Sequence, residues 1–359
     1  MSQRPCGPRS VRVGAVALAI AALGFGALGA AALALRDAPA GPVAIVPGNE
    51  PFVGPTAMLP IRFHADAFEL RQLPPDELPY VRDAYPSLTE PPLVDAAGAR
   101  VVERDGAIVD HPVAQAQYGL GLLAGLAATN DADYLRRARI QADRLMDRAV
   151  WVEEVIYFPY PFDFPRHGDP IDVMRAPWYS GMAQGQALSL LVRLAETTGD
   201  DRYADAADAT FDSFLRLRRK GSDPDSRGIG LEETDPWIAF VDEHGYYWVE
   251  EYAGGGRPPD LTFNGLGFAL YGLVDYARFT GDPDARLLIR GLLTTIDRAA
   301  AAIRVAGETS RYCLTHGTQD ARYHATHIGQ MEELHRLTGD RRFARWATLL
   351  RQDSGGERG

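Results

Sequence analysis

The chain has 359 residues, enough for one large domain or two ordinary ones with a full hydrophobic core. It carries 37 Lys and Arg against 48 Asp and Glu, a formal net charge of −11, and has no run of consecutive Lys and Arg longer than three residues. This balance argues against a nucleic-acid-binding protein, although a local cluster of Arg and Tyr can still bind an acidic substrate.

The first predicted element is an uncharged apolar run at residues 13–35. As a helix it would be about 34 Å long, enough to span a bilayer. Three arginines precede it, so residues 1–12 are expected in the cytoplasm and the rest of the chain outside. A cleaved signal peptide is the alternative, because residues 38–40 read Ala-Pro-Ala. We therefore expect a single-pass cell-membrane protein with an extracytoplasmic domain, or a secreted one if the segment is cleaved.

The next residues are rich in proline and glycine and lack helical periodicity. Residues 36–60 are expected to form a linker, and residues 61–111 a loop-rich lead-in with one or two short strands. A helical domain is expected at 112–352, followed by a disordered tail at 353–359. The chain is thus predicted to be mainly α.

Four related turns divide the helical region: Ala128-Thr129-Asn130-Asp131, Thr198-Gly199-Asp200, Thr280-Gly281-Asp282 and Thr338-Gly339-Asp340. Asn or Gly suits the left-handed residue that ends a helix, and the following Asp suits the N-cap of the next helix. Each turn therefore predicts a helical hairpin. The first helices are expected at 112–128, 180–197, 264–279 and 324–337, and the second at 132–149, 201–218, 283–304 and 340–351.

The intervals between these turns are uneven, which favours an incomplete (α/α) toroid over a regular solenoid or a bundle. If the first helix of every hairpin points the same way, the segments before these helices emerge at one end. Those segments contain tyrosines, carboxylates and amides. The sequence therefore predicts that polar aromatic residues line one mouth of the toroid.

No nucleophile-elbow or phosphate-loop motif occurs in the chain. The nearest metal-like set is His316, His324, His327 and His335, but no zinc-protease motif accompanies it. Hydrogen-bonding or capping roles are favoured for these histidines, and neither a metal nor a cofactor is expected. The two cysteines, Cys6 and Cys313, provide neither a disulfide framework nor a cysteine-rich zinc site.

Two stretches are candidates for chemistry. In Trp248–Tyr252, aromatic residues flank Glu250 and Glu251, which suggests partial burial and a carboxyl pKa raised toward the range of general acid–base catalysis. A solvated surface patch is the alternative. Residues 178–186 (WYSGMAQGQ) are equally compatible with a helix start capped by Ser180 and with a sugar-binding surface.

In these motifs the sequence resembles the C-terminal catalytic domain of the D-glucuronyl C5-epimerases, which convert D-glucuronate to L-iduronate within heparan-type polysaccharides. The resemblance covers about residues 112–350, and its most specific motif is residues 178–187. The other matching segments are 115–120 (QAQYGL), 250–252 (EEY), 264–265 (NG), Tyr312 and 323–328 (YHATHI).

The resemblance implies that one group removes H5 and another returns a proton to the opposite face, without a redox cofactor. Four residues carry these catalytic roles by motif: Glu251 and Tyr252 on one side, and Tyr312 and Tyr323 on the other or at the substrate carboxylate. The expected substrate-binding residues are Gln117, Tyr118, Trp178, Tyr179, Gln184, Gln186, Glu250, Asn264, His324 and His327. The expected partner is a uronic-acid-containing polysaccharide.

The chain departs from the family pattern in two places. Thr315 stands where the family commonly has Arg, and only residues 41–111 replace a longer β-rich region that supports dimerisation and can hold calcium. A homodimer and a calcium site therefore stay open. Two other functions also stay open: a uronate polysaccharide lyase on the same toroid, and a non-catalytic glycan-binding envelope protein.

Overall fold

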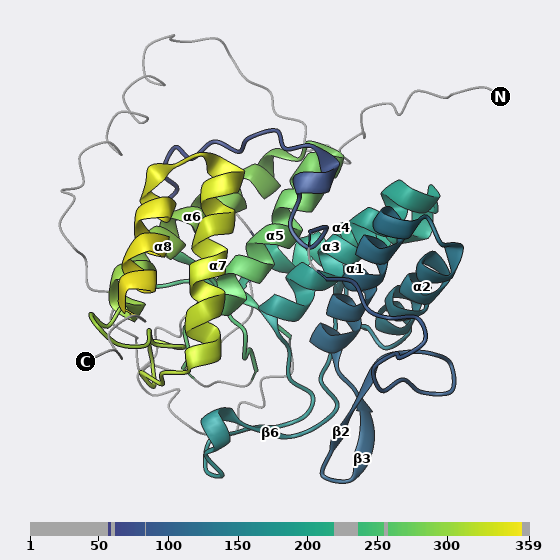
Figure 1. The fold of residues 1–359 in the computed structure, drawn as a ribbon. Helices are drawn as coiled ribbons and strands as arrows, with labels where there is room; N and C mark the ends of the chain where they lie inside the picture. Colours follow the sequence, from purple (N-terminus) through teal and green to yellow (C-terminus); the bar gives the residue numbers. More distant parts are fainter. Residues whose placement is uncertain (1–56, 59–61, 83, 219–235, 255–257, 354–359) are drawn as a thin grey trace, which may run out of the picture. The chain divides into compact units, whose positions relative to one another are not determined.

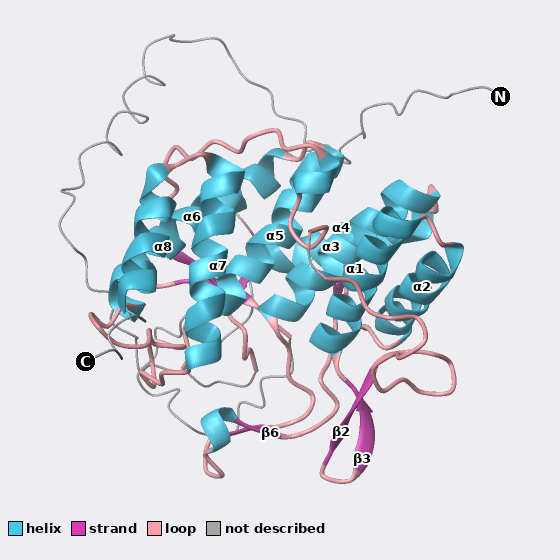
Figure 2. Cartoon of the chain, viewed as in Figure 1, coloured by secondary structure: helices cyan, strands magenta, loops and turns pink. Residues whose placement is uncertain are grey.

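The computed structural model describes residues 57–58, 62–82, 84–218, 236–254 and 258–353, all of which lie in one compact unit, Val43–Gly359. This described part is mainly helical (Figures 1 and 2). Its helices are α1 (Pro112–Thr129), α2 (Ala132–Asp147), α3 (Gly181–Thr198), α4 (Asp201–Leu215), α5 (Phe263–Thr280), α6 (Pro283–Ile303), α7 (Ala321–Thr338) and α8 (Arg341–Asp353).

The structure confirms the predicted turns and explains why threonine recurs in them. The left-handed residues that end α1, α3, α5 and α7 have φ between 57° and 74°. In the turn after α3, the Thr198 hydroxyl donates to the carbonyl of Leu194 at 2.6 Å and accepts the N–H of Asp200 at 3.2 Å. Asp200 then accepts the N–H of Arg202 and caps α4. Each turn therefore satisfies backbone groups that would be orphaned at a helix end.

Short strands occupy the intervals between hairpins, and the sequence patterns gave no sign of most of them. One sheet has the order β1-β8-β9-β10, in which only the β8–β9 pair is parallel, and three separate hairpins pair β2 with β3, β4 with β5 and β6 with β7. The strands are β1 (Ala57–Met58), β2 (Val101–Arg104), β3 (Ala107–Asp110), β4 (Val150–Val152), β5 (Val155–Tyr157), β6 (Phe164–Pro165), β7 (Val173–Met174), β8 (Arg216–Arg218), β9 (Ala239–Val241) and β10 (Tyr247–Val249).

Two helix predictions needed correction. The helix expected at 201–218 ends at Leu215, because residues 216–218 pair as β8 in the sheet. The helix expected at 324–337 begins at Ala321, because the Asp320 carboxylate accepts the N–H of Arg322 and caps it three residues earlier. In the lead-in, β2 and β3 are the short strands that the sequence predicted, whereas β1 falls in the predicted linker.

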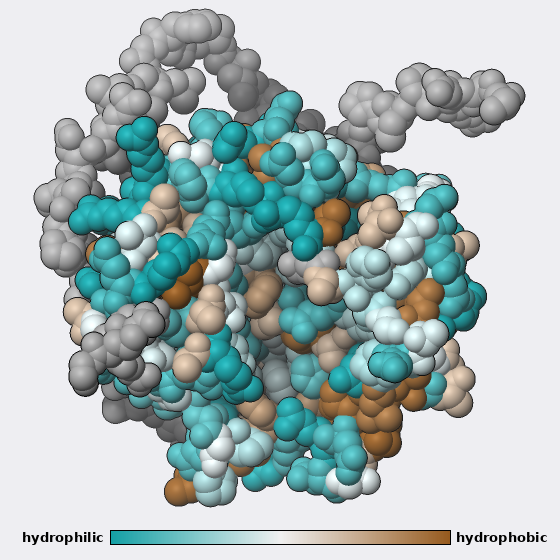
Figure 3. All heavy atoms as spheres, viewed as in Figure 1, coloured by the Kyte–Doolittle hydropathy of each residue, from teal (hydrophilic) through white to brown (hydrophobic). Residues whose placement is uncertain are grey.

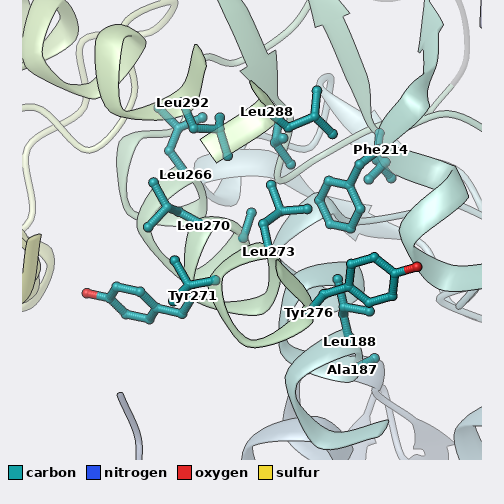
Figure 4. Close-up of a cluster of buried hydrophobic side chains, with 14 of the residues drawn as sticks. Ala187, Leu188, Phe214, Leu266, Leu270, Tyr271, Leu273, Tyr276, Leu288 and Leu292 are labelled. Carbon is teal, nitrogen blue, oxygen red and sulfur yellow. The ribbon is translucent and has the colours of Figure 1, made fainter. Parts of the chain in front are cut away.

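The hairpins form two layers, with α1, α3, α5 and α7 packed side by side in chain order and α2, α4, α6 and α8 behind them. Helices α3 and α5 bury most of their residues, whereas α2 and α8 bury one stripe each. Figure 4 shows the centre of the core, where leucines of α5 meet residues of α3, α4 and α6. This is the arrangement of an incomplete (α/α) toroid, as the sequence predicted.

Helices α3 and α5 cross with their backbones in contact at Gly185 and Gly272. A Cβ atom on Gly272 would lie 2.1 Å from the carbonyl oxygen of Gly185, and one on Gly185 would lie 2.4 Å from the Cα of Ala269. Only glycine fits this crossing, because the atoms that would clash belong to the backbone.

We expect Gly272→Ala to destabilise the protein by more than about 2 kcal/mol, because overpacking at the crossing outweighs the gain in helix propensity of about 1 kcal/mol. The measurement is denaturant unfolding of the full chain. Gly329→Ala in α7 is the matched control, since a Cβ there meets no atom within 4 Å. The control should be neutral or slightly stabilising; equal stability of the two variants would contradict the packing account.

The predicted membrane segment at 13–35 lies outside the described residues, as do most of the linker and nearly all of the predicted tail. In the ranges that are described, no helix is long and apolar enough to cross a membrane. On the face shown in Figure 3, apolar side chains gather over the β2–β3 hairpin, where Ile108 is 55% exposed.

Candidate active site

A cavity of about 390 Å³ lies where the N-terminal ends of α1, α3, α5 and α7 meet. This convergence confirms the prediction that the segments before these helices gather at one mouth. A larger cavity of about 700 Å³ lies near the C-terminal end of α5 and contains none of the predicted site residues. The smaller cavity is lined by Arg104, His111, Val113, Gln117, Tyr160, Phe162, Phe164, Trp178, Ser180, Met182, Glu251, Tyr252, Asn264, Phe268, Tyr323 and Thr326.

Helix N-termini and one arginine bring positive charge to the cavity in spite of the acidic chain. Helix N-termini carry partial positive charge, and four of them point at this space. Arg104 adds a full charge at the rim, where its guanidinium lies over the rings of Phe162 and Phe164 at 5.4 and 5.7 Å. Such a cavity is suited to an anionic group such as a carboxylate.

His111 caps α1 and stays neutral. Its Nδ1 accepts the N–H of Ala114 at 3.2 Å, so Nε2 carries the hydrogen of the neutral ring. Burial and the charge of Arg104 lower the pKa of His111 to about 4. At neutral pH this histidine can therefore donate a hydrogen bond but contributes no charge.

The segment after β10 carries two buried carboxylates with different surroundings. Glu250 accepts the backbone N–H groups of Tyr252 at 3.0 Å and Leu261 at 3.1 Å, and it does not line the cavity. Burial, followed by the charge of Asp260, raises the pKa of Glu250 to about 8. We conclude that Glu250 fixes the backbone of the loop that positions Glu251.

Glu251 lines the cavity and is 7% exposed. Burial raises the pKa of Glu251 to about 7, against hydrogen bonds from Tyr312, Tyr252 and Asn264 that lower it. Both the protonated and the ionised form of the carboxyl group are therefore accessible near neutral pH. That is the condition in which a carboxylate is most useful for general acid–base catalysis.

Three tyrosines surround this carboxylate. The Tyr312 hydroxyl donates to Oε1 of Glu251 at 3.1 Å, and the Tyr252 hydroxyl lies 2.6 Å from that of Tyr312. The rings of Tyr312 and Tyr323 lie 4.1 Å apart. Burial and then the charge of Glu251 raise the pKa of all three hydroxyls, so all three are proton donors at neutral pH. The result is a hydrogen-bonded chain from Tyr252 through Tyr312 to Glu251.

An aromatic wall forms the other side of the cavity. Trp178 stacks on Tyr160 at 3.8 Å and on Phe164 at 5.7 Å, and Phe164 stacks on Tyr252 at 5.5 Å. The indole N–H of Trp178 donates to the carbonyl of Phe162 at 2.8 Å, which fixes the ring. A flat apolar wall opposite polar groups is typical of small-ligand sites.

Several residues that the sequence proposed for substrate binding lie outside the cavity lining. Gln184 holds β5 in place through Ile156, Phe158 and Ser213. His324 accepts the N–H of Ser310 and donates to the carbonyl of Leu350, while His327 hydrogen-bonds the Ser310 hydroxyl. Buried side chains outside the lining also include Tyr118, Tyr179 and Gln186. Of the residues proposed for binding, Gln117, Trp178 and Asn264 do line the cavity.

The sequence reading missed part of the lining. Arg104 and His111 lie in the region taken as a lead-in, and Tyr160, Phe162 and Phe164 lie between two predicted hairpins. A signal was present in residues 157–164, YFPYPFDF, because such a dense aromatic and proline run is unusual for a simple connection.

At the mouth of this toroid of helical hairpins, Glu251, Tyr252, Tyr323 and Arg104 line one cavity and Tyr312 hydrogen-bonds Glu251, which defines an acid–base site suited to an anionic group. The comparisons agree with this class. Residues 153–351 match the family described as D-glucuronyl C5-epimerase C-terminus, and the chain belongs to that family.

Other similarities are more distant. An uncharacterised protein of Methanocaldococcus jannaschii is 27% identical over 61% of this chain and 67% of its own. Among solved structures, the unsaturated glucuronyl hydrolase of Streptococcus agalactiae is 15% identical, with a TM-score of 0.43 over 67% of this chain and 57% of that one. A family 76 α-mannanase of Bacteroides thetaiotaomicron is 14% identical, with a TM-score of 0.44 over 69% and 58%. The chain spans less than two thirds of each of those solved chains.

Proposed function

We propose that the protein is a uronyl C5-epimerase that inverts D-glucuronate to L-iduronate within a polysaccharide. The observation that carries the proposal is the hydrogen-bonded chain from Tyr252 through Tyr312 to Glu251, at the edge of a cavity whose charge favours a carboxylate. Inversion needs a base on one face of C5 and an acid on the other. This cavity holds a carboxyl group near its pKa beside protonated tyrosines.

The proposed steps balance in protons. Ionised Glu251 removes H5, and the electrons of the C5–H bond pass into the uronate carboxyl group, whose negative charge Arg104 and the helix N-termini stabilise. Tyr252 or Tyr323 gives a proton to C5 from the opposite face. When Tyr252 is the donor, Tyr312 returns a proton to it and receives the one held by Glu251. This relay resets the site without a cofactor. When Tyr323 is the donor, solvent water returns a proton to it and takes up the one held by Glu251.

The substrate is proposed to be a polymer, in keeping with a cavity that is open at the mouth of the toroid. The aromatic wall of Tyr160, Phe164 and Trp178 would pack against sugar rings. The proposal also places the enzyme on the outer side of the cell membrane, on the strength of the apolar segment at 13–35.

Product analysis tests the proposal. The full chain is incubated with heparosan and other glucuronate polymers, and the products are followed by NMR and by the absorbance of unsaturated uronate. Iduronate without unsaturated product is the expected result. Unsaturated product would make the enzyme a lyase, in which the C4 substituent leaves after H5 is removed. If the protein binds a polymer but forms neither product, it is a glycan-binding protein and the proposal is wrong.

A substitution beside Glu251 tests whether its position matters. A Cβ on Gly265 would lie 2.9 Å from Oε2 and 3.0 Å from the Cβ of Glu251. We expect Gly265→Ala to lower kcat/KM roughly 10²-fold, because a displacement of the base by about 1 Å costs that much. The unfolding transition of Gly265→Ala should remain cooperative, which shows that the variant folds. Gly329→Ala is again the control, and unchanged activity in Gly265→Ala would contradict the placement of Glu251.

A further inference from the structure

Beside the active site, three metal-ligating side chains converge from distant parts of the chain. The donor atoms of His167, Cys313 and His316 all lie within 4.8 Å of one another. Cys313 Sγ lies 3.4 Å from Nε2 of His167 and 3.6 Å from Nδ1 of His316. In a tetrahedral zinc site with bonds of about 2.0–2.3 Å, neighbouring ligand atoms are roughly 3.3–3.7 Å apart. The observed spacing is that of a coordination shell.

The Asp260 carboxylate lies beside this group of three, although it is not one of the side chains whose donor atoms are all mutually close. Asp260 is fully buried; its Oδ2 lies 3.6 Å from Nε2 of His167, and its Oδ1 lies 3.7 Å from Nδ1 of His316. These separations are too long for good hydrogen bonds. Oδ2 accepts no hydrogen bond from the described residues, although a buried carboxylate oxygen normally has a partner. A bound cation would satisfy it.

The orientation of the His167 ring excludes a catalytic relay from Asp260 through His167 to Cys313. In a Cys–His–Asp relay the thiol and the carboxylate contact opposite nitrogens of one imidazole. Here His167 presents the same nitrogen, Nε2, to both Cys313 and Asp260. His316 likewise presents Nδ1 to both. The donor atoms of His167, Cys313 and His316 therefore face one common space, with Asp260 beside it.

The second nitrogen of His316 has the partner that a metal ligand normally has. Its Nε2 lies 3.5 Å from Oδ2 of Asp172, and a carboxylate in this position orients a ligating histidine. Arg166 contacts both Asp172 and Asp260. With a divalent cation, a thiolate, two carboxylates and one guanidinium, the formal charges at this partly exposed place sum to zero.

We infer that His167, Cys313 and His316 bind one Zn²⁺ ion, with the Asp260 carboxylate beside it. A thiolate and two imidazoles favour zinc over Mg²⁺ or Ca²⁺, which prefer oxygen ligands. The four histidines that the sequence singled out do not form this group, since His316 joins His167 and Cys313 instead.

The ion fastens the segment that carries Tyr312. Cys313 follows Tyr312 directly, and the segment around it is bonded to residues 260–263 through Phe263 N–H to the Tyr312 carbonyl at 3.0 Å. The ring of His167 lies edge-on to that of Tyr312 at 5.8 Å. The metal therefore ties together the β6–β7 connection, the residues before α5 and the segment before α7.

Cobalt substitution tests the site without any assay of activity. The full chain is stripped with a chelator and titrated with Co²⁺, then with Zn²⁺. We expect one equivalent of Co²⁺ to give the visible bands of a tetrahedral ion and a thiolate charge-transfer band, and Zn²⁺ to displace it. Cys313→Ser should lose the charge-transfer band, and Asp172→Asn should bind 10- to 100-fold more weakly. His64→Ala, at an exposed histidine outside the cluster, is the matched control.

Thermal unfolding provides the second readout. Zn²⁺ should raise the Tm of the stripped wild-type chain and of His64→Ala, but not that of Cys313→Ser or His316→Ala. Absence of the thiolate band in the wild-type protein would overturn the inference, and so would a band that persists in Cys313→Ser. If Cys313→Ser does not fold, His316→Ala decides by the same two readouts.

Discussion

Replacing Glu251 by glutamine is expected to lower kcat/KM by about 10²- to 10⁴-fold, the usual contribution of a positioned general base. The amide has nearly the same shape and can still accept the Tyr312 hydroxyl, so the fold should persist. In the wild-type enzyme, activity should rise with pH through about 7, because burial raises the pKa of Glu251 to that value and only the ionised form removes H5. The variant should lose this dependence. The measurement is a pH profile of kcat/KM.

Glu250→Gln is the matched control, since Glu250 is adjacent, equally buried and outside the cavity lining. Its carboxylate holds the N–H groups of Tyr252 and Leu261, so its loss should affect stability more than catalysis. A larger loss of activity in Glu250→Gln than in Glu251→Gln would transfer the role of base to Glu250.

Replacing Tyr312 by phenylalanine is expected to lower kcat by roughly 10²-fold and to shift the pH profile. The Tyr312 hydroxyl is the middle member of the relay, and its hydrogen bond lowers the pKa of Glu251. Without that bond the pKa of Glu251 rises further, so the rise in activity should move to higher pH. KM should change little, because Tyr312 does not line the cavity.

Tyr276→Phe is the control for this prediction. Its hydroxyl also donates to a carboxylate, that of Asp208, at 2.7 Å. Tyr276 lies in the part of α5 that is remote from the cavity. It should leave kcat and the pH profile unchanged. A Tyr312→Phe variant with lower kcat but an unshifted profile would show that the hydroxyl does not tune Glu251.

The fold was largely predictable because its signals are local. Thr, Gly and Asp at each turn fix the end of one helix and the start of the next, as the contacts of Thr198 and Asp200 show. Apart from β2 and β3, the strands were not predictable, since segments of two or three residues such as β8 are held by pairing with residues distant in sequence. The start of α7 was misplaced because the cap at Asp320 precedes the apolar pattern.

The site was predictable where a motif lies directly at a helix N-terminus, as with Asn264 and Tyr323, or in the loop beside one, as with Glu251. Within α3, the motif alone could not tell which amide faces the cavity: Gln184 points instead to β5 and α4. The proposed zinc ligands could not be predicted from the sequence, for another reason. His167 and Cys313 are 146 residues apart, and only tertiary packing brings them together.

Solvent exchange at C5 tests the central claim most directly. The full chain and its Glu251→Gln variant are incubated in D₂O with the glucuronate polymer that the wild-type enzyme converts, and deuterium at C5 is followed by NMR. The account predicts deuterium at C5 of the iduronate residues with the wild-type chain, and almost none with the variant. Inverted product that keeps its original hydrogen at C5 would contradict the transfer of one proton to Glu251 and another from a tyrosine.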